Sequence, residues 1–317
     1  MFEMPKAAEI VLKKCLGLKK NEKFLVITDS KLYNLGNMFF REAKKITNSA
    51  KLIKIPIPKV NGTEPPKKTA KEMLKYDAEL LITTKSLSHT KARKKACKNG
   101  ARIVTMPGIT KSTVNRALNI DYRKLKKIDS KLADIIDNGN KVRIKTKLGT
   151  DIGFSINGRK AYGRESGIYD KKGSYGNLPT GEIFVAPVEK SANGVFVADA
   201  SFAGIGKLKN PLKIYVKRGY AVNLKGVNAK KMEGLLDSVG KEGRNIAELG
   251  IGTNEKAKIT GNVLEDEKVK GTCHIALGNN TGFGGKVSVQ LHLDGIIKNP
   301  TIFVDKKKIM GNGKLII

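Results

Sequence analysis

The hexapeptide QLHLDG, residues 290–295, places a histidine two residues before an aspartate inside an alternating apolar run. Successive side chains of a β-strand point to opposite faces of the sheet, so residues two apart share a face. His292 and Asp294 would therefore stand side by side, opposite the face that carries Leu291 and Leu293. This arrangement suits a metal ion, a proton relay or a surface ion pair, and the strand alone leaves all three open.

Three further residues in the second half of the chain could join this pair. His274 lies in the same half, and imidazole and carboxylate groups are common ligands of catalytic metals. Glu182 and Glu248 lie in tracts of Gly, Pro, Leu, Ile and Ala without an adjacent basic residue. A buried carboxylate is costly unless something pairs with it, and a divalent cation would do so. The candidate metal ligands are thus Glu182, Glu248, His274, His292 and Asp294.

Other residues of chemical interest receive structural interpretations. His89 lies at an expected helix start without a nearby carboxylate, so we expect it to be structural. A helix around residues 265–277 would point Cys273 and His274 about 100° apart, so we expect Cys273 to be a small buried residue rather than a second ligand. The glycine-rich segment 278–285 lacks the following helix with Lys and Ser/Thr that phosphate binding requires, and we expect a mobile turn.

The elements that position these residues fall into two patterns. In the first half, apolar strand patterns alternate with helical ones, which predicts a mainly parallel sheet with helices on both faces. The expected strands are 23–30, 50–58, 78–86 and 101–109, and the expected helices are 34–46, 66–77, 90–100 and 111–139, the last broken near Asp121. No dinucleotide-binding or P-loop motif follows any of these strands.

The second half alternates apolar and polar residues around turns, as β-hairpins do. Hairpins are expected over 141–158, 182–201 and 212–226, with a helix over 228–239 and a strand over 245–252. The segment 163–181 is expected to be a long loop. The predicted fold is an α/β N-terminal domain with a mainly parallel sheet, residues 1–139, followed by an α+β, hairpin-rich, metal-binding C-terminal domain, residues 140–317.

Composition narrows the class of protein. The chain has 317 residues and a net charge of +32, and residues 1–150 hold 35 basic and 13 acidic residues. That basic half could make non-specific contacts with nucleic acid, although no nucleic-acid-binding motif accompanies it. No apolar run approaches the length of a membrane span. Residues 1–20 have a helical pattern without a signal-peptide core. The three scattered cysteines favour a reducing cytoplasmic setting.

The motifs together resemble a known family. The segments NLPTGEIFVAP, ELGIGTNEKAKITGNVLEDEKVKGTCHIALGNN and HLDG, with LGTDIGFSINGR before them, are similar to metallo-aminopeptidases of the aminopeptidase T and aminopeptidase S group. This resemblance covers residues 140–317 well and the first domain by architecture alone. It implies a homodimer, a peptide substrate and two divalent ions such as zinc or cobalt. It matches Glu182, Glu248, His274, His292 and Asp294 to the family's ligands, with His274 on a helix.

We therefore predict a metal-dependent aminopeptidase in which two ions activate a water molecule. One departure favours another reading: where the family has a tyrosine after its helix histidine, this chain has Thr281 by spacing. The alternative is a mononuclear Fe(II) dioxygenase, because His274, His292 and Asp294 supply the two histidines and one carboxylate of such sites. Ring-opening dihydroxypyridine dioxygenases resemble the same scaffold. A nucleic-acid-binding protein without catalysis is the third hypothesis.

Overall fold

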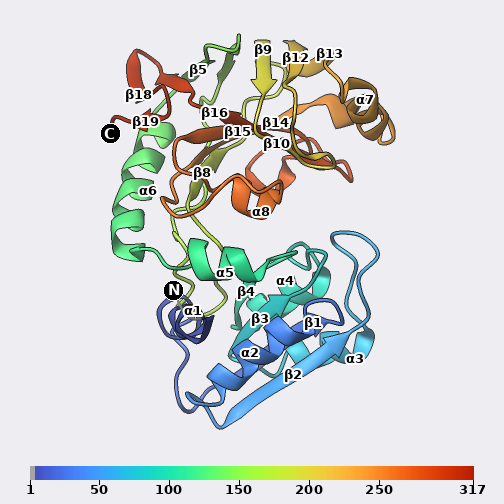
Figure 1. Ribbon diagram of the computed structural model, residues 1–317, viewed down its shortest axis with the longest axis vertical. Coiled ribbons are helices and arrows are strands. Elements are labelled where there is room, and N and C mark those ends of the chain that lie inside the picture. Colours follow the sequence, from blue (N-terminus) through green and yellow to red (C-terminus); the bar gives the residue numbers. More distant parts are fainter. Residues whose placement is uncertain (1–3) are drawn as a thin grey trace. The chain divides into compact units, whose positions relative to one another are not determined.

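The computed structural model describes residues 4–317 and separates the chain into two compact units (Figure 1). The first unit extends to Tyr122 and includes Gly167–Thr180, and the second comprises Arg123–Ser166 and Gly181–Ile317. The domain boundary predicted after residue 139 stays a prediction. The expected N-terminal helix is present as α1 (Met4–Glu9) and a π-helical continuation η1 (Ile10–Cys15), and its residues 1–3 lie outside the described part.

The first unit contains a five-stranded parallel sheet with the strand order β2-β1-β3-β4-β7. Its strands are β1 (Lys23–Asp29), β2 (Ser49–Ile55), β3 (Ala78–Ile82), β4 (Arg102–Thr105) and β7 (Tyr175–Asn177). Its helices α2 to α5 are Tyr33–Ala43, Lys67–Met73, Lys91–Lys98 and Lys111–Ala117. Buried apolar residues fill β1, β3 and β4, because a parallel sheet is covered on both faces. The α/β prediction for this region is confirmed.

One strand of this sheet comes from a segment that the sequence pattern assigned to a loop. β7 pairs in parallel with β4, so the chain returns to the first sheet after helix α6 (Tyr122–Asp137) and the hairpin that follows it. The strand is only three residues long and contains Gly176, which explains why no alternating pattern indicated it.

The second unit has two antiparallel sheets with a shared core. The eight-stranded sheet has the order β13-β12-β9-β6-β5-β17-β18-β19, and the six-stranded sheet has the order β11-β10-β16-β15-β14-β8. One core cluster contains buried residues of both sheets and of α6, for example Val142, Ile275 and Ile136. The predicted antiparallel, hairpin-rich C-terminal region is confirmed.

The strands and helices of the second unit have the following bounds. The eight-stranded sheet contains β5 (Lys141–Lys145), β6 (Asp151–Ser155), β9 (Asn193–Ala198), β12 (Leu212–Lys217), β13 (Tyr220–Lys225), β17 (Thr301–Val304), β18 (Lys307–Gly311) and β19 (Lys314–Leu315). The six-stranded sheet contains β8 (Glu182–Val185), β10 (Ser201–Phe202), β11 (Gly206–Lys207), β14 (Ile246–Gly252), β15 (Thr272–Gly278) and β16 (His292–Lys298). The remaining helices are α7 (Ala229–Asp237), α8 (Val263–Asp266) and the 3-10 turns η2 (Lys241–Arg244) and η3 (Thr281–Phe283).

Two local predictions in this unit were wrong. Residues 182–201 do not form a hairpin, because β8 pairs with β14 while β9 pairs with β6 and β12. Gly194 is a glycine because the backbone of Asp151 lies where its Cβ would be, 2.2 Å from the carbonyl oxygen. The expected helix over 265–277 is limited to α8, and His274 lies on strand β15. Cys273 and His274 therefore point to opposite faces of a sheet, with Cys273 in the core.

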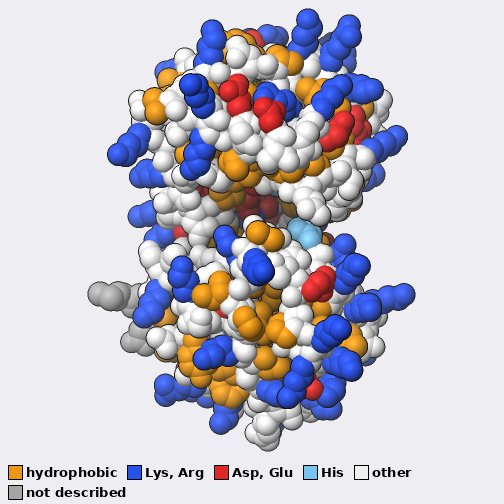
Figure 2. Space-filling view, turned by 90° about the vertical axis from the view of Figure 1, so that its right-hand side faces the viewer, with side chains coloured by type: hydrophobic (Ala, Val, Ile, Leu, Met, Phe, Trp, Pro, Cys, Tyr) orange, Lys and Arg blue, Asp and Glu red, His pale blue; other side chains and the backbone are white. Residues whose placement is uncertain are grey.

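No helix in residues 4–317 is long and apolar enough to cross a membrane. Lysine and arginine side chains are scattered over the face shown in Figure 2 and do not gather in one patch. On that face, the positive charge of the protein is therefore spread over the general surface.

Candidate metal centre

Four neighbouring strands of the six-stranded sheet, β8, β14, β15 and β16, carry all five predicted ligands. The side chains on one face of these strands pack in the core, for example Ile183, Leu249 and Ile275. The alternation of strand side chains places Glu182 and His274 on the other face. The predicted pairing of His292 and Asp294 on one strand face is present, because both belong to β16.

Small residues leave room for the charged side chains on this face. In the strand register, Gly250 is opposite His274, and Ala276 is opposite both Glu248 and Asp294. A Cβ atom added to Gly250 would lie 2.0 Å from Cε1 and 2.1 Å from Nε2 of the His274 ring. The imidazole thus occupies the space directly above the glycine, which fixes the height of the ring over the sheet.

Four side chains converge on one point. Glu248 contacts both imidazoles, with Oε1 3.2 Å from Nε2 of His274 and Oε2 3.3 Å from Nε2 of His292. Asp294 Oδ1 lies 3.3 Å from Nε2 of His292 and 4.0 Å from Nε2 of His274. These contacts form a closed ring of alternating imidazole and carboxylate groups. Adjacent ligands of an octahedral ion at about 2.1 Å are separated by about 3 Å, so the ring has nearly the dimensions of a metal coordination shell.

The orientation of His292 is set by its second nitrogen. Nδ1 lies 2.8 Å from the carbonyl oxygen of Asn279, and an N–H at that position donates to the carbonyl. This leaves Nε2 directed at Glu248 and Asp294. Metal-binding histidines usually have this arrangement, because the outer hydrogen bond fixes the tautomer and the ring orientation.

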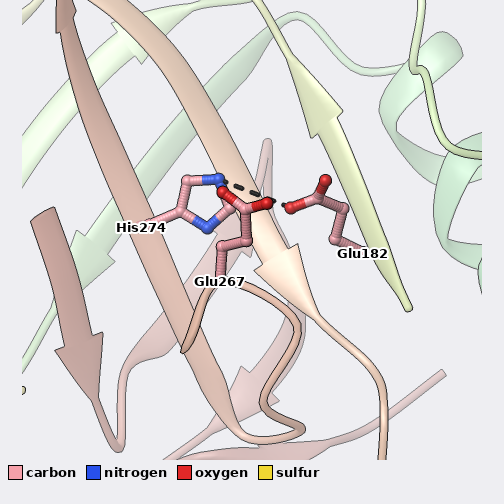
Figure 3. Close-up of side chains that lie close together, drawn as sticks. All are labelled: Glu182, Glu267 and His274. Atoms are coloured by element: carbon pink, nitrogen blue, oxygen red, sulfur yellow. Dashed lines mark ion pairs between the residues drawn. The ribbon is translucent and has the colours of Figure 1, made fainter. Parts of the chain in front are cut away.

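A second group of ligand atoms adjoins the first. Glu182, Glu267 and His274 offer one ligand atom each within 4.8 Å of one another, as do Glu248, His292 and Asp294. Figure 3 shows the first trio, with the carboxylates of Glu182 and Glu267 beside the His274 ring. Glu182 Oε2 lies 3.7 Å from His274 Nε2. The chain therefore contains candidate metal sites built from histidine, glutamate and aspartate, as the sequence predicted.

Glu267 and its neighbour Lys268 are site residues that the sequence did not indicate. They follow α8, and the Lys268 ammonium forms ion pairs with Glu182 and with Glu267, the latter at 2.5 Å. In the sequence both residues belong to the charged run EDEKVK, which has the composition of an exposed loop. Only the proximity of this run to β8 makes them part of the site.

Two atoms at the site have no hydrogen-bond partner in the protein. Nδ1 of His274 and Oε2 of Glu182 are both buried and unpartnered within residues 4–317. Buried polar atoms are nearly always satisfied, so orphaned ones indicate a ligand, an ion or water. Two orphans within one cluster of histidines and carboxylates are compatible with a bound cation.

The ionisation of these groups is dominated by their mutual contacts. Burial opposes a charge on His274, yet the hydrogen bond to Glu248 and the nearby Asp294 and Glu182 raise its pKa to about 9. The pKa of His292 is also raised, because Asp294 and Glu248 outweigh its desolvation. In the same way, burial disfavours ionised Asp294, but His292 lowers its pKa to about 2. The imidazoles and the carboxylates of Glu248 and Asp294 thus favour each other's charged forms.

Contacts with Glu182 and with each other also influence the pKa values of Glu267 and Lys268. Burial raises the pKa of Glu267 to about 8, although the Lys268 ammonium favours its ionised form. Burial also disfavours the charged form of Lys268, but Glu182 and Glu267 raise its pKa. The ammonium therefore remains protonated at neutral pH.

Aromatic side chains lie beside His292, the more exposed of the two histidines at the site. The ring of Phe283, in η3, contacts His292 edge to face with centroids 5.9 Å apart. Phe283 also contacts Phe184 and Tyr162 at 5.4 Å and 6.3 Å, and the latter two stack on each other. The glycine-rich segment that the sequence assigned to a mobile turn thus places an aromatic ring against the candidate site.

The fold and the histidine–carboxylate cluster define a two-unit protein with a candidate metal centre in its antiparallel unit. Comparison with known proteins gives the family. The model of the NicX family, 2,5-dihydroxypyridine 5,6-dioxygenase, matches residues 3–317, so the chain belongs to this family. A 2,5-dihydroxypyridine 5,6-dioxygenase of Pseudomonas putida KT2440 is 24% identical over an alignment of 261 residues that covers 75% of this chain and 71% of the relative.

Solved structures show the same fold. The structure of 2,5-dihydroxypyridine dioxygenase from Pseudomonas putida KT2440 has a TM-score of 0.84 at 18% identity, over 99% of this chain and 96% of the other. Wild-type AmpT from Thermus thermophilus has a TM-score of 0.71 at 16% identity, over 99% of both chains. At these identities the two structures are evidence of a shared fold only.

The family match overturns the aminopeptidase assignment. The segments that resemble aminopeptidases T and S mark the shared scaffold, which AmpT also has, and do not identify the family. The predicted hydrolase activity and peptide substrate are therefore wrong, and the alternative reading as a dioxygenase is the better supported one. The homodimer expected through the same resemblance loses that support. The sequence misled because both classes share this fold, so motifs that follow the scaffold do not distinguish them.

Proposed function

We propose that this protein is a ring-cleaving dioxygenase that opens 2,5-dihydroxypyridine with O2 and uses one Fe(II) ion. The observation that carries the proposal is the closed ring of Glu248, His274, His292 and Asp294 in a chain of the NicX family. Two imidazoles and a carboxylate are the donors of many non-haem Fe(II) oxygenases. The activity printed for the Pseudomonas putida relative supplies the substrate.

The geometry of these four donor groups is suitable for binding an iron ion. The four donor groups are 3.2–4.0 Å from their neighbours around the ring, and the Asn279 carbonyl holds His292 in the orientation that directs Nε2 inward. Gly250 provides the space in which the His274 ring lies. Fe(II) in such a site would supply the one-electron chemistry that lets O2 react with an aromatic ring.

Aromatic residues beside the open side of the site would position the substrate. The side chain of His292 is 32% exposed, so the site is open on that side, whereas His274 is fully buried. The aromatic rings of Phe283, Phe184 and Tyr162 lie next to this opening. A planar pyridine ring would gain contact area and ring–ring attraction there. In the reaction, both atoms of O2 enter the product as one ring bond breaks.

The protein is first loaded with Fe(II) in the absence of oxygen. Its turnover of the substrate is then measured in the presence of O2. We expect 2,5-dihydroxypyridine and O2 to disappear in equal amounts, and we expect His292→Ala to lose bound iron and activity together. Ser288→Ala, a change in the exposed segment before β16, is the matched control and should keep both. Iron-loaded protein that consumes neither compound would contradict the proposal.

A further inference from the structure

A lysine is buried at the candidate metal centre. The side chain of Lys268 is 3% exposed, although most of the lysine and arginine side chains that the structure describes lie at the surface. Its ammonium touches one oxygen of Glu182 and one oxygen of Glu267, whose side chains are each 14% exposed. Burying a charged group is unfavourable unless opposite charges surround it, so these two carboxylates hold the lysine in place.

The carboxylates that bind Lys268 belong to a potential ligand set. Glu182, Glu267 and His274 form one of the two groups whose ligand atoms are close enough to hold an ion (Figure 3). A divalent ion there would share oxygens with the ammonium and would be repelled by it at close range. The oxygens that an ion would need in this group are thus already in contact with a cation that the chain supplies.

The other group lacks such a lysine. Among the ion pairs of residues 4–317, those of Glu248 and Asp294 are formed with His274 and His292 only. Imidazole nitrogens are themselves metal ligands, whereas the Lys268 ammonium contacts the carboxyl oxygens that an ion would otherwise use. The two groups therefore differ in the kind of cation that balances them.

From this difference we infer that the Lys268 ammonium takes the place of a second metal ion and limits the centre to one. The single ion is held by Glu248, His274, His292 and Asp294, while Glu182 and Glu267 contact the lysine. The inference rests on the proposed function only in requiring that a metal is bound. The earlier assignment of Glu182 as a metal ligand stays a prediction that the same experiment tests.

The experiment measures how many ions the full-length protein binds. Metal-free protein is dialysed to equilibrium against Co²⁺, bound cobalt is counted by elemental analysis, and the visible spectrum of the bound ion is recorded. We expect one equivalent for the unaltered protein and two for Lys268→Met, with a second set of absorption bands. Lys270→Met, an exposed lysine two residues away, is the matched control and should bind one equivalent.

Two further variants make the result decisive. Lys268→Met combined with Glu182→Gln should return to one equivalent, because the new site then lacks a ligand. Glu182→Gln alone should keep the single ion, and this result does not depend on whether Lys268→Met folds.

Several results would overturn the inference. These are two equivalents in the unaltered protein, loss of the ion in Glu182→Gln, no bound cobalt at all, or one equivalent in a folded Lys268→Met variant. The expected stoichiometries without turnover of 2,5-dihydroxypyridine would contradict the proposed function alone.

Discussion

Glu248 is the residue on which the geometry of the candidate centre depends most. Its two oxygens contact one imidazole each, and it is buried. Burial opposes its ionisation, but the hydrogen bonds from His274 and His292 lower its pKa. A carboxylate bound to two imidazoles orders both rings before any ion arrives, which reduces the cost of assembling the site.

Gly250 gives a test at the same scale. We expect Gly250→Ala to weaken Co²⁺ binding by at least tenfold, because the added Cβ would lie about 2 Å from the His274 ring and displace it. Isothermal titration calorimetry would measure the affinity. Gly153→Ala, on strand β6, is the control, since the nearest atom to its added Cβ is 3.5 Å away. Equal affinities in the two variants would show that the ring position is not critical.

At the scale of elements, β3 contains an unusual buried acid. Glu79 is fully buried, and neither of its carboxyl oxygens has a hydrogen-bond partner within residues 4–317. It is paired in register with Leu25 of β1 and Ile103 of β4, at the centre of the parallel sheet. Burial raises its pKa well above the ordinary value, so the folded state favours the protonated acid.

This acid predicts a pH-dependent stability. Because the pKa of Glu79 is higher in the folded than in the unfolded state, its ionisation destabilises the fold increasingly as the pH rises above the unfolded value. We expect Glu79→Met to raise the free energy of unfolding by about 1–3 kcal/mol at pH 8 and by less at pH 4.5. Urea denaturation followed by circular dichroism at both pH values would measure it.

The control for this prediction is a surface carboxylate. Glu9→Met removes an exposed ion pair with Lys13 and should change stability little at either pH. A Glu79→Met variant that is less stable than the unaltered protein at pH 8 would contradict the prediction.

The 3-10 turn η3 provides a second prediction for an element. If its Phe283 ring contacts the substrate, Phe283→Ala should raise KM for 2,5-dihydroxypyridine by about three- to tenfold with little change in kcat, which corresponds to the loss of one aromatic contact. Steady-state oxygen consumption would measure both constants. Tyr215→Ala, on β12 of the other sheet, should leave them unchanged. A fall in kcat at constant KM would instead indicate that Phe283 supports His292.

At the scale of the whole molecule, all the candidate ligands belong to the second unit. Ligand binding stabilises the state that binds, by about 2.7 kcal/mol at a hundred times the dissociation constant. We expect added Co²⁺ to slow hydrogen exchange of the amides in β14, β15 and β16 and to leave those in β1 to β4 nearly unchanged. Exchange monitored by mass spectrometry would show this. Equal slowing in both sets of strands would contradict a site confined to one unit.

The sequence by itself determined the local patterns of this protein. Alternating strands and helices in the first half predicted the parallel sheet, and the break of the helical pattern near Asp121 matches the division between α5 and α6. The period of two along β16 placed His292 and Asp294 on one face. These predictions succeed because hydrophobic periodicity and turn chemistry act over a few residues, within one element.

Only the tertiary structure decided how distant segments meet. The hairpin expected around Gly194 was wrong because strand pairing depends on which sheets share the core, and the helix expected around His274 was replaced by a strand of a buried sheet. Glu267 and Lys268 join the site through contacts with β8, more than eighty positions away in the chain, which no local pattern encodes. The charges around the candidate metal site are set by such contacts, because charges interact through space.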